Sequence, residues 1–598
     1  MKYRWSLAPP QPSLAAPLVA ALGIPPLLAQ CLLNRGLTDP AIAGVFLEPR
    51  LKHLADPFLL PNMAVAVERL LQARERKEAL VIFGDYDVDG VTSTALLLEV
   101  LCGLGWLANY YLPHRRDEGY GLSQDAVENC LNKFPVTLLL AVDCGSTTVG
   151  SIAWLRQRGV DAIVLDHHQV SSPAPAATAL VNPRFSASPS ADAVPAPNLA
   201  AADGVTHPLG IAGISENRFG ELCSVGLAFK LAHALVKRGR EVGLPGAAAF
   251  DLRPLLDLVA LGTIADVVPL TAENRPLVAA GLERLNTTRR PGLIALKRVA
   301  QSPAVLTTHE VGYQLAPRLN AAGRLETAED ALRLLLARDA AEATPIAQQL
   351  EARNRERQTI ERAIAEEVVR VVQARFDPNQ DFVIVEGHDQ WHIGVVGIVA
   401  SRVLQQFYRP TIILGGDGNE WRGSGRSIAE FDLAAALHQC GDLLLRHGGH
   451  AMAAGLSLAP ENLMAFRTRL NELARQAINP EHLQPALRLD AEVFLGDLSL
   501  ACFAALDRLR PTGQGNPPVQ LCARSLRLQR AVHRMGADKQ HLKMWVTDGQ
   551  ATHEAVWWAA GNNAPPASPF DLAFAPQLNH YNGRRIVQLK VLDWRPSQ

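Results

Sequence analysis

Three short apolar runs, each followed at once by acidic residues or histidines, constrain the fold of this chain more than any other feature. They cover residues 79–83, 136–142 and 162–165 and are dense in valine, isoleucine and leucine. Such runs are typical of parallel strands that are buried on both faces. Helix-like segments separate them, so residues from about 65 to 270 predict an α/β domain. Open α/β sheets bind ligands outside the carboxyl ends of their strands, where these polar residues stand.

The first run leads into GDYDVDG, which places Asp85, Asp87 and Asp89 at alternate positions. Three carboxylates this close repel one another, and divalent cations relieve the repulsion because they prefer oxygen ligands. A calcium-binding EF-hand loop can begin in the same way, but it needs a bidentate glutamate at its twelfth position. Counted from Asp85, that position is Leu96. The motif by itself therefore leaves a catalytic metal site and a polar turn as alternatives.

Three further motifs contain acidic residues and histidines. Asp143 follows the second run in AVDCGS and is by itself either a helix cap or a metal ligand. The third run leads into Asp166, His167 and His168, and a carboxylate next to imidazoles suits Mn²⁺ or Mg²⁺. Asp257 and Asp266 lie in the apolar stretch LDLVALGTIADVVPL, and Asp266 reads either as a helix-terminal cap or as a ligand.

The four motifs GDYDVDG, VDCG, DHH and GTIADVVPL occur in the order seen in DHH phosphoesterases, and the chain resembles that family. The resemblance implies a centre with two metal ions, Mn²⁺ or Mg²⁺, which activate a water and stabilise the leaving oxygen of a phosphodiester. It implies six metal-site residues: Asp85, Asp87, Asp89, Asp143, His167 and Asp266. It also implies that His168 contacts the metal or the substrate phosphate and that Asp166 orients its neighbours.

The middle of the chain predicts a long helix and a second α/β lobe. Residues 328–376 have strongly helical composition, and an α/β pattern follows from about 382 to 458. This second part contains HIGVVGIVASR, RGSGRSI and HGGHAMAAG, which together resemble the DHH-associated domain. Each glycine cluster taken singly reads as a tight turn, although glycines also let backbone N–H groups approach a phosphate. The resemblance implies that this lobe faces the metal centre across a cleft, with the catalytic His450 at the scissile phosphate.

Arginines in both lobes are candidates for binding substrate phosphates, because their guanidinium groups form paired hydrogen bonds with phosphates. The predicted substrate-binding residues are Arg115, Arg318, Arg324, Arg402, Ser424 and Arg426. Weaker candidates are His114, Arg116, Tyr120, Arg353, Arg357, Arg422 and Ser427. We expect Arg115, Ser424 and Arg426 to form a pocket for a 5′ end, which would make the enzyme an exonuclease.

Residues from about 487 to 598 contain short alternating runs with glycine and asparagine turns, which predict a small β-barrel. With RPTGQGNPPVQ, this part resembles the oligonucleotide-binding (OB) barrel of the RecJ-type members of the family. Such barrels combine basic and aromatic residues to bind single strands. The candidates are Lys543, Trp545, Trp558, Tyr581 and Arg584, although aromatic residues in a small barrel are more often part of its core.

The predicted fold is α/β, with a DHH lobe and a DHH-associated lobe joined by a long helix, and a C-terminal OB-type barrel. The predicted divisions are residues 1–55 (helical lead-in), 56–325 (DHH), 326–376 (connecting helix), 377–480 (DHH-associated) and 481–598 (OB). Residues 186–220, rich in alanine and proline, are predicted to form a surface insertion.

The RecJ-like resemblance implies a single-stranded-DNA-specific 5′ to 3′ exonuclease that releases mononucleotides in DNA recombination and repair. It also implies single-strand-binding protein and a RecQ-like helicase as partners, and we expect a cytoplasmic monomer. Two alternatives remain. Another DHH enzyme would act on short oligonucleotides, cyclic dinucleotides or pyrophosphate, which the added barrel disfavours. A non-catalytic DNA-binding scaffold is disfavoured because every acidic and histidine position is present.

Composition excludes some classes of protein without selecting one. The eight cysteines form no CxxC pair, which fits a reducing compartment and argues against zinc ribbons. No run of about 18 apolar residues predicts a membrane span. There is no Walker A motif, so ATP-driven unwinding is not supported. The formal net charge of −1 decides nothing about nucleic-acid binding, because acidic and basic regions can be kept apart.

Overall fold

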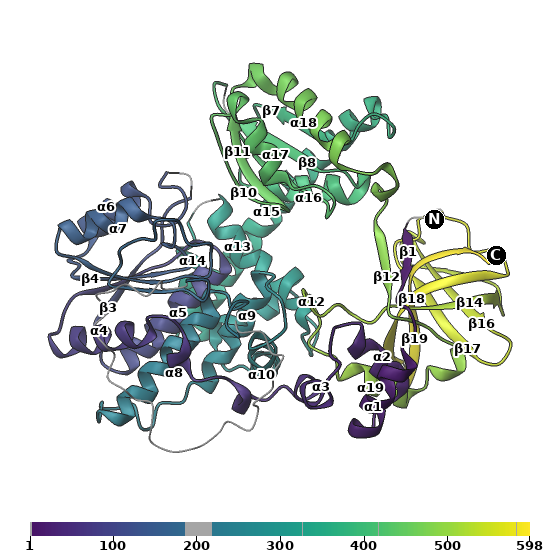
Figure 1. Cartoon of the computed structure of the whole chain (residues 1–598), viewed down its shortest axis with the longest axis horizontal. Coiled ribbons are helices and arrows are strands. Elements are labelled where there is room, and N and C mark those ends of the chain that lie inside the picture. Colours follow the sequence, from purple (N-terminus) through teal and green to yellow (C-terminus); the bar gives the residue numbers. More distant parts are fainter. Residues whose placement is uncertain are drawn as a thin grey trace.

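The computed structural model describes residues 3–185 and 218–597, apart from residues 116, 326, 417, 562 and 582 and the side chains of residues 325, 581 and 584. The predicted insertion therefore lies outside the described residues as far as residue 217. Figure 1 shows two lobes, one above the other, with a β-barrel beside them. This arrangement confirms the predicted fold class.

A five-stranded parallel sheet, in the order β3-β2-β4-β5-β6, forms the centre of the first lobe. Its three predicted strands are confirmed as β2 (Leu80–Phe83), β4 (Leu138–Val142) and β5 (Asp161–Leu165). Alternate residues of these strands belong to two different apolar cores, one on each face of the sheet, which is why the runs are continuously apolar. The other elements are β3 (Ala108–Tyr111), β6 (Ala179–Val181), α4 (Met63–Glu75), α5 (Val88–Gly103), α6 (Gln124–Lys133), α7 (Val149–Gln157) and α8 (Ser224–Glu241).

A layer of helices packs on the α5 and α8 side of this sheet and continues its core. The helices are α9 (Leu256–Ala265), α10 (Asn274–Asn286), α11 (Pro291–Val299), α12 (Thr308–Glu310), α13 (Ala316–Leu325) and α14 (Glu329–Leu336), with a π-helical turn at Val311–Leu315. The structure has a break within the predicted 326–376 helix, because Asp339 caps a new helix, α15 (Ala340–Arg375), by accepting hydrogen bonds from two backbone N–H groups. Helix α15 joins the lobes: Leu350 packs in the first core and Val372 in a core of the second lobe.

The second lobe contains a mixed sheet in the order β10-β11-β9-β8-β7, in which only β7 and β8 are parallel. Its elements are β7 (Ile384–His388), α16 (Val396–Phe407), β8 (Thr411–Gly416), β9 (Trp421–Arg426), α17 (Leu433–Gln439), β10 (Arg446–His450), β11 (Ala453–Leu458) and α18 (Leu463–Ala477). Two of the predicted glycine turns are strands. A Cβ atom on Gly425 would lie 2.5 Å from Leu433, so this glycine leaves room for a core side chain.

The C-terminal part is a closed barrel, because β14 pairs with β18 and also with β16, which completes the ring through β17 and β19. The elements are β12 (Ala486–Leu489), β13 (Ala491–Glu492), α19 (Leu500–Asp507), β14 (Leu521–Leu528), β15 (His533–Met535), β16 (His541–Thr547), β17 (Thr552–Trp557), β18 (Phe570–Tyr581) and β19 (Arg584–Pro596).

Residues 3–50 belong with the barrel in space, although they lie at the opposite end of the sequence (Figure 1). Strand β1 (Arg4–Leu7) pairs with β12, and helices α1 (Pro12–Leu22), α2 (Pro26–Leu33) and α3 (Pro40–Leu47) share the barrel's apolar core. No single described helix is long and apolar enough to span a membrane. The bent pair α1–α2 is together long and apolar enough for a span by length and composition alone. Its residues Leu18, Leu28 and Leu32 are fully buried against the barrel. The division into residues 1–55, 56–325, 326–376, 377–480 and 481–598 stays a prediction.

Arg275 of α10 connects the first lobe to both ends of the chain. Its side chain is fully buried, and its guanidinium donates hydrogen bonds to the carbonyl of Phe46 and to four consecutive carbonyls of residues 508–511, at 2.7–3.3 Å. The Cζ atom lies 3.7 Å from the centre of the Phe46 ring. Burial lowers the pKa of Arg275 to about 9. A buried cation is tolerated here because carbonyl oxygens accept all of these hydrogen bonds.

We expect Arg275→Met to lower the free energy of unfolding by about 3 kcal/mol, because several buried carbonyls lose their donor while no cavity forms. Thermal unfolding and limited proteolysis of the 270–275 and 508–516 segments measure the effect. Arg50→Met is the control, since the Arg50 side chain is 61% exposed. Coincident unfolding curves for Arg275→Met and the unmodified protein would show that this contact does not hold the barrel in place.

Candidate metal centre

The predicted metal-site residues meet at the carboxyl edge of the parallel sheet. Asp85, Asp87 and Asp89 lie between the end of β2 and the first turn of α5. Asp143 follows β4 directly, and His167 is the second residue after β5. Asp266 comes from elsewhere, at the carboxyl end of α9. Parallel strands bring their carboxyl ends to one edge, which explains why segments far apart in the sequence converge.

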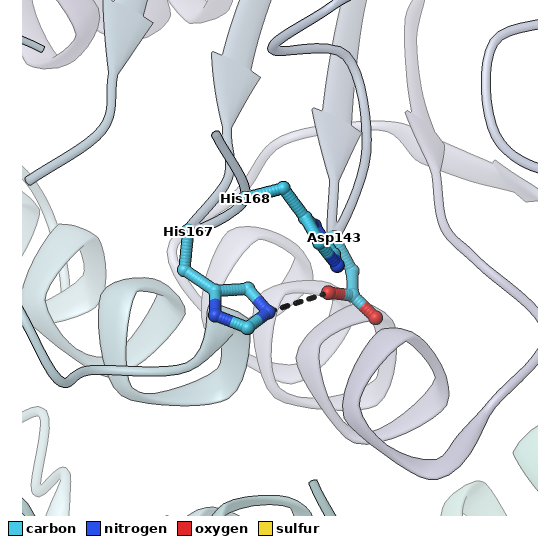
Figure 2. Close-up of side chains that lie close together, drawn as sticks. All are labelled: Asp143, His167 and His168. Carbon is cyan, nitrogen blue, oxygen red and sulfur yellow. Dashed lines mark ion pairs between the residues drawn. The ribbon is translucent and has the colours of Figure 1, made fainter. Parts of the chain in front are cut away.

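His167 lies at the middle of the cluster. Its Nε2 is 3.5 Å from Oδ1 of Asp143, 3.7 Å from Oδ2 of Asp266 and 4.0 Å from Oδ2 of Asp89. Figure 2 shows the imidazole turned toward the Asp143 carboxylate. These separations are too long for good hydrogen bonds.

Three atoms of the cluster are buried and have no hydrogen-bond partner among the described residues: Nε2 of His167, Oδ2 of Asp266 and Oδ1 of Asp85. Buried polar atoms in proteins are normally paired, so an orphaned set of ligand atoms is what a cation would satisfy. The donor set of carboxylates and imidazole fits Mn²⁺ or Mg²⁺.

Ligand atoms within 4.8 Å of one another form three groups: Asp143, His167 and His168; Asp85, Asp87 and Asp143; and Asp89, Cys223 and Asp266. Asp143 belongs to two of them, so its carboxylate would be a ligand in either group. Burial, followed by the charge of Asp89, raises the pKa of the Cys223 thiol far above its usual value. A protonated thiol is a poor ligand for a hard cation, which leaves Asp89 and Asp266 as the useful members of that group.

The electrostatics of the centre favour a bound cation. Burial, followed by repulsion from Asp87, raises the pKa of Asp89 to about 7. Burial and the charges of Asp89 and Asp87 raise the pKa of Asp266 to about 9. Burial, with His168 next, lowers the pKa of His167 to about 3, so its imidazole is neutral and able to coordinate a metal.

The amino end of α8 supports the cluster, which the sequence alone did not indicate. Backbone N–H groups of Ser224 and Val225 donate to the carboxylate of Asp89 at 2.7 and 2.8 Å, and the Ser224 hydroxyl donates to Asp143 at 2.9 Å. No motif marks Cys223–Ser224–Val225, because the contribution comes mainly from backbone atoms. Asp143 has a φ of 64°, a conformation that is costly for aspartate and that occurs most often at functional sites.

Asp166 orients the histidine pair, as predicted from the motif. One of its oxygens accepts hydrogen bonds from the backbone N–H of His167 at 2.8 Å and lies 2.7 Å from Nδ1 of His168, and the other accepts from the N–H of Ser146. Burial acts to raise the pKa of Asp166, but the hydrogen bond and charge of His168 lower it overall. Burial acts to lower the pKa of His168, but the bond to Asp166 raises it. The side chain of His168 is 40% exposed.

A group of arginines from both lobes lies beside the acidic cluster. Arg324 of α13 donates to the carbonyl of Gly394 in the second lobe at 3.1 Å. Burial lowers the pKa of Arg324 to about 10, and the charges of Arg115, Arg357 and Arg426 contribute, so each of these three cations lies near Arg324. On β9, Arg426 donates to the Ser424 hydroxyl at 2.8 Å. Such crowding of positive charge next to Asp87 is typical of a phosphate-binding site.

Other predicted phosphate-binding residues already have partners inside the protein. Arg318 pairs with Glu351 at 2.6 Å, and Arg402 pairs with Glu361, which also pairs with Arg357. Arg353 pairs with Asp330. The pairs of Arg318, Arg402 and Arg353 join α13, α16 and α14 to α15, whereas the pair of Arg357 with Glu361 lies within α15.

The remaining predicted residues differ in how they are placed. Arg422 lies 3.7 Å from Glu420, and His114 pairs with Asp117. The buried Ser427 donates to the carbonyl of Phe431. The Tyr120 hydroxyl donates to the backbone carbonyl of Asp143. His450 is exposed at the end of the edge strand β10, and Arg116 lies outside the described residues.

The barrel presents an aromatic and basic surface. Side chains of β16 alternate, so that Met544 faces the core while Lys543 and Trp545 face outward. Arg530 and Lys543 lie 5.2 and 5.3 Å from the Trp545 ring centre, and Trp558 is 47% exposed. Trp545 is therefore outside the barrel core. The side chains of Tyr581 and Arg584 lie outside the described residues.

Three family models match the chain: the DHH family N-terminal domain at residues 79–263, the DHHA1 domain at 379–476 and the RecJ OB domain at 489–593. The chain is 34% identical to "Single-stranded-DNA-specific exonuclease RecJ" of Bacillus subtilis, over 100% of this chain and 71% of that protein.

Two crystal structures of RecJ from Thermus thermophilus are also similar, and both cover 100% of this chain and 80% of that one. The complex with Mn²⁺ has a TM-score of 0.80 at 30% identity, and the complex with Mg²⁺ has 0.74 at 28%. Because the likeness extends over all three domains and over the metal-site motifs, this chain belongs to the RecJ family of the DHH phosphoesterases.

Proposed function

We propose that this chain is a metal-dependent exonuclease that hydrolyses single-stranded DNA, as the name of its Bacillus subtilis relative states for that protein. The observation that carries the proposal is the buried cluster of repelling carboxylates next to arginines contributed by both lobes. Mn²⁺ or Mg²⁺, which the Thermus thermophilus structures contain, would be held by Asp85, Asp87, Asp89, Asp143, His167 and Asp266. Such ions supply Lewis-acid stabilisation and lower the pKa of a bound water.

The protein's own residues then position the substrate. His168, fixed by Asp166, is placed to donate a hydrogen bond to a phosphate oxygen at the centre. Arg324 and Arg426 neutralise phosphates between the lobes. Ser224 and the backbone of α8 hold Asp89 and Asp143 in place, which removes the need for reorganisation during the reaction. His450, on a strand of the second lobe, is proposed to approach the scissile phosphate.

The direction of degradation follows from the arginine group. We assign Arg115, Ser424 and Arg426 to a pocket for a terminal 5′ phosphate, which supports 5′ to 3′ degradation with release of 5′-mononucleotides. The outward face of the barrel around Trp545 supports binding of the single strand farther from the cut. Single-strand-binding protein and a RecQ-like helicase as partners, a monomeric state, a cytoplasmic location and a role in recombination and repair stay predictions from family resemblance.

Asp143→Asn should lower the rate of DNA cleavage by roughly a thousandfold or more, because it removes a carboxylate that bridges two ligand groups. The initial rate on single-stranded DNA with Mn²⁺ measures this loss. Asp125→Asn on the exposed face of α6 is the matched control. The metal-free variant should unfold at a higher temperature than the metal-free unmodified protein, because one repelling charge is gone. Cleavage at the rate of the unmodified protein would show that Asp143 is not part of the metal centre.

DNA labelled at either end tests the direction. We expect early release of a 5′-labelled mononucleotide with Mn²⁺ and none with EDTA. Arg426→Ala should weaken the preference for a 5′ phosphate over a 5′ hydroxyl about tenfold through KM, because a charged hydrogen bond to the terminal phosphate is lost. Arg469→Ala, on α18 of the same lobe, is the control, because its side chain is 40% exposed and pairs with Asp442. Early release from the 3′ end contradicts the pocket. Hydrolysis of a dinucleotide without cleavage of long DNA would favour a short-substrate enzyme.

Metal binding should strengthen as the pH rises. The pKa values of Asp89 and Asp266 are raised from 3.8 to about 7 and about 9, so the folded protein binds these protons more tightly than the unfolded chain does. The metal-free protein therefore loses stability as the pH rises from about 4 to about 9. Metal ions displace the protons, so the rise in melting temperature with Mn²⁺ should be larger at pH 8 than at pH 6. Thermal unfolding with Mn²⁺ and with EDTA measures it, and equal rises would contradict the assignment.

A further inference from the structure

A second cavity lies in the first lobe at the far end of the helices that carry the metal centre. Its volume is about 780 Å³, and its charged walls are Glu99, Asp257, Arg284, Arg289, Arg290 and Arg338. On α5, the metal-site residue Asp89 and the cavity residue Glu99 are ten residues apart, and on α9 the cavity residue Asp257 precedes Asp266 by nine. The helical rise therefore places this cavity about 13–15 Å along each helix from the metal-site end. The cavity is thus separate from the catalytic cluster.

Arg290 forms ion pairs with both acidic residues of the cavity lining. Its guanidinium pairs with Glu99 and lies 3.4 Å from Asp257, which also accepts a hydrogen bond from the Thr288 hydroxyl at 2.8 Å. A further hydrogen bond runs from Arg290 to the carbonyl of Leu335. Glu99 and Asp257 are therefore paired with Arg290 and form no ion pair with the other arginines of the lining.

The other three arginines, Arg284, Arg289 and Arg338, form no ion pair with any residue that the structure describes. Four arginines against two carboxylates give the lining residues a formal charge of +2. The amino end of α11, which begins at Pro291, also lines it and adds the positive end of a helix dipole. Like charges converge on a concave wall only at a cost, and a bound anion offsets that cost.

We propose that this cavity binds a small ligand with two or more linked phosphate groups. The volume lies within the range of small-molecule sites. Its uncharged walls are prolines, threonines, Leu336 and Ala337, with no aromatic residue among the described lining. Recognition therefore rests on the phosphates and not on stacking of a base. Inorganic polyphosphate and nucleoside polyphosphates both carry the linked phosphates that the arginines would bind.

Calorimetric titration of the full chain with tripolyphosphate and with dATP, in EDTA, tests the proposal. Arg289→Ala/Arg338→Ala should weaken binding of tripolyphosphate about a hundredfold, because two charged contacts are lost. Both side chains are exposed, so folding is preserved, and equal melting temperatures check this. Arg298→Ala, on α11, is the matched control and should bind as the unmodified protein does. Equal affinities for the two probes show that the phosphates alone are recognised, whereas tighter binding of dATP assigns the site to nucleotides.

Two variants separate this site from the arginine group at the metal centre. Arg115→Ala/Arg426→Ala should leave binding of tripolyphosphate to this cavity unchanged and remove only what binds at the arginine group. Binding that is lost in this variant and retained in Arg289→Ala/Arg338→Ala would overturn the proposal, as would absence of binding at millimolar tripolyphosphate. A ten-nucleotide oligothymidylate is the third probe. If the Arg289→Ala/Arg338→Ala variant loses affinity for the oligonucleotide as strongly as for tripolyphosphate, the cavity is part of a DNA path and the proposal fails.

Discussion

Mutual repulsion of buried carboxylates is the constraint on which the rest of this structure depends. Burial and neighbouring negative charge hold the pKa of Asp85 and of Asp143 far above the usual value. Folding the apo chain around them is costly, and protons or divalent cations are what relieve the cost. The neutral His167 and the backbone N–H groups of α8 fit the same requirement, because each offers a ligand or a hydrogen bond without adding negative charge.

The two lobes are joined so that positive charge meets this negative centre. Helix α15 carries apolar residues of both cores, and Arg324 reaches from α13 to the backbone of the second lobe. Many of the nearby arginines are paired with glutamates of α15, and these pairs fix the lobes relative to each other. Arg115, Arg324 and Arg426 form no ion pair among the described residues, and this difference separates the proposed binding arginines from the structural ones.

A third body is attached by a different kind of interaction. The barrel closes over an apolar core to which the first helices of the chain contribute, so the two ends of the sequence form one unit. The fully buried Arg275 joins this unit to the first lobe through carbonyl oxygens, with no acidic partner among the described side chains. Its hydrogen bonds are directional, which fixes the orientation of the joint more closely than apolar contact would.

Sequence by itself determined the local elements and the chemistry of the centre. The strands β2, β4 and β5, the alternating aspartates after β2 and the histidine pair after β5 were all predictable, because continuous apolar runs and closely spaced like charges have few physical explanations. Only the tertiary structure decided the roles that depend on distant partners. Ser224 donates a hydrogen bond to Asp143 from 81 residues away. Arg402 is paired with Glu361, whereas Arg426 is not paired with an acid among the described residues. Gly425 packs in a strand, although its sequence context also fits a turn. Side-chain partners at long sequence separation leave no periodic or compositional pattern, and so they are set only when the chain has folded.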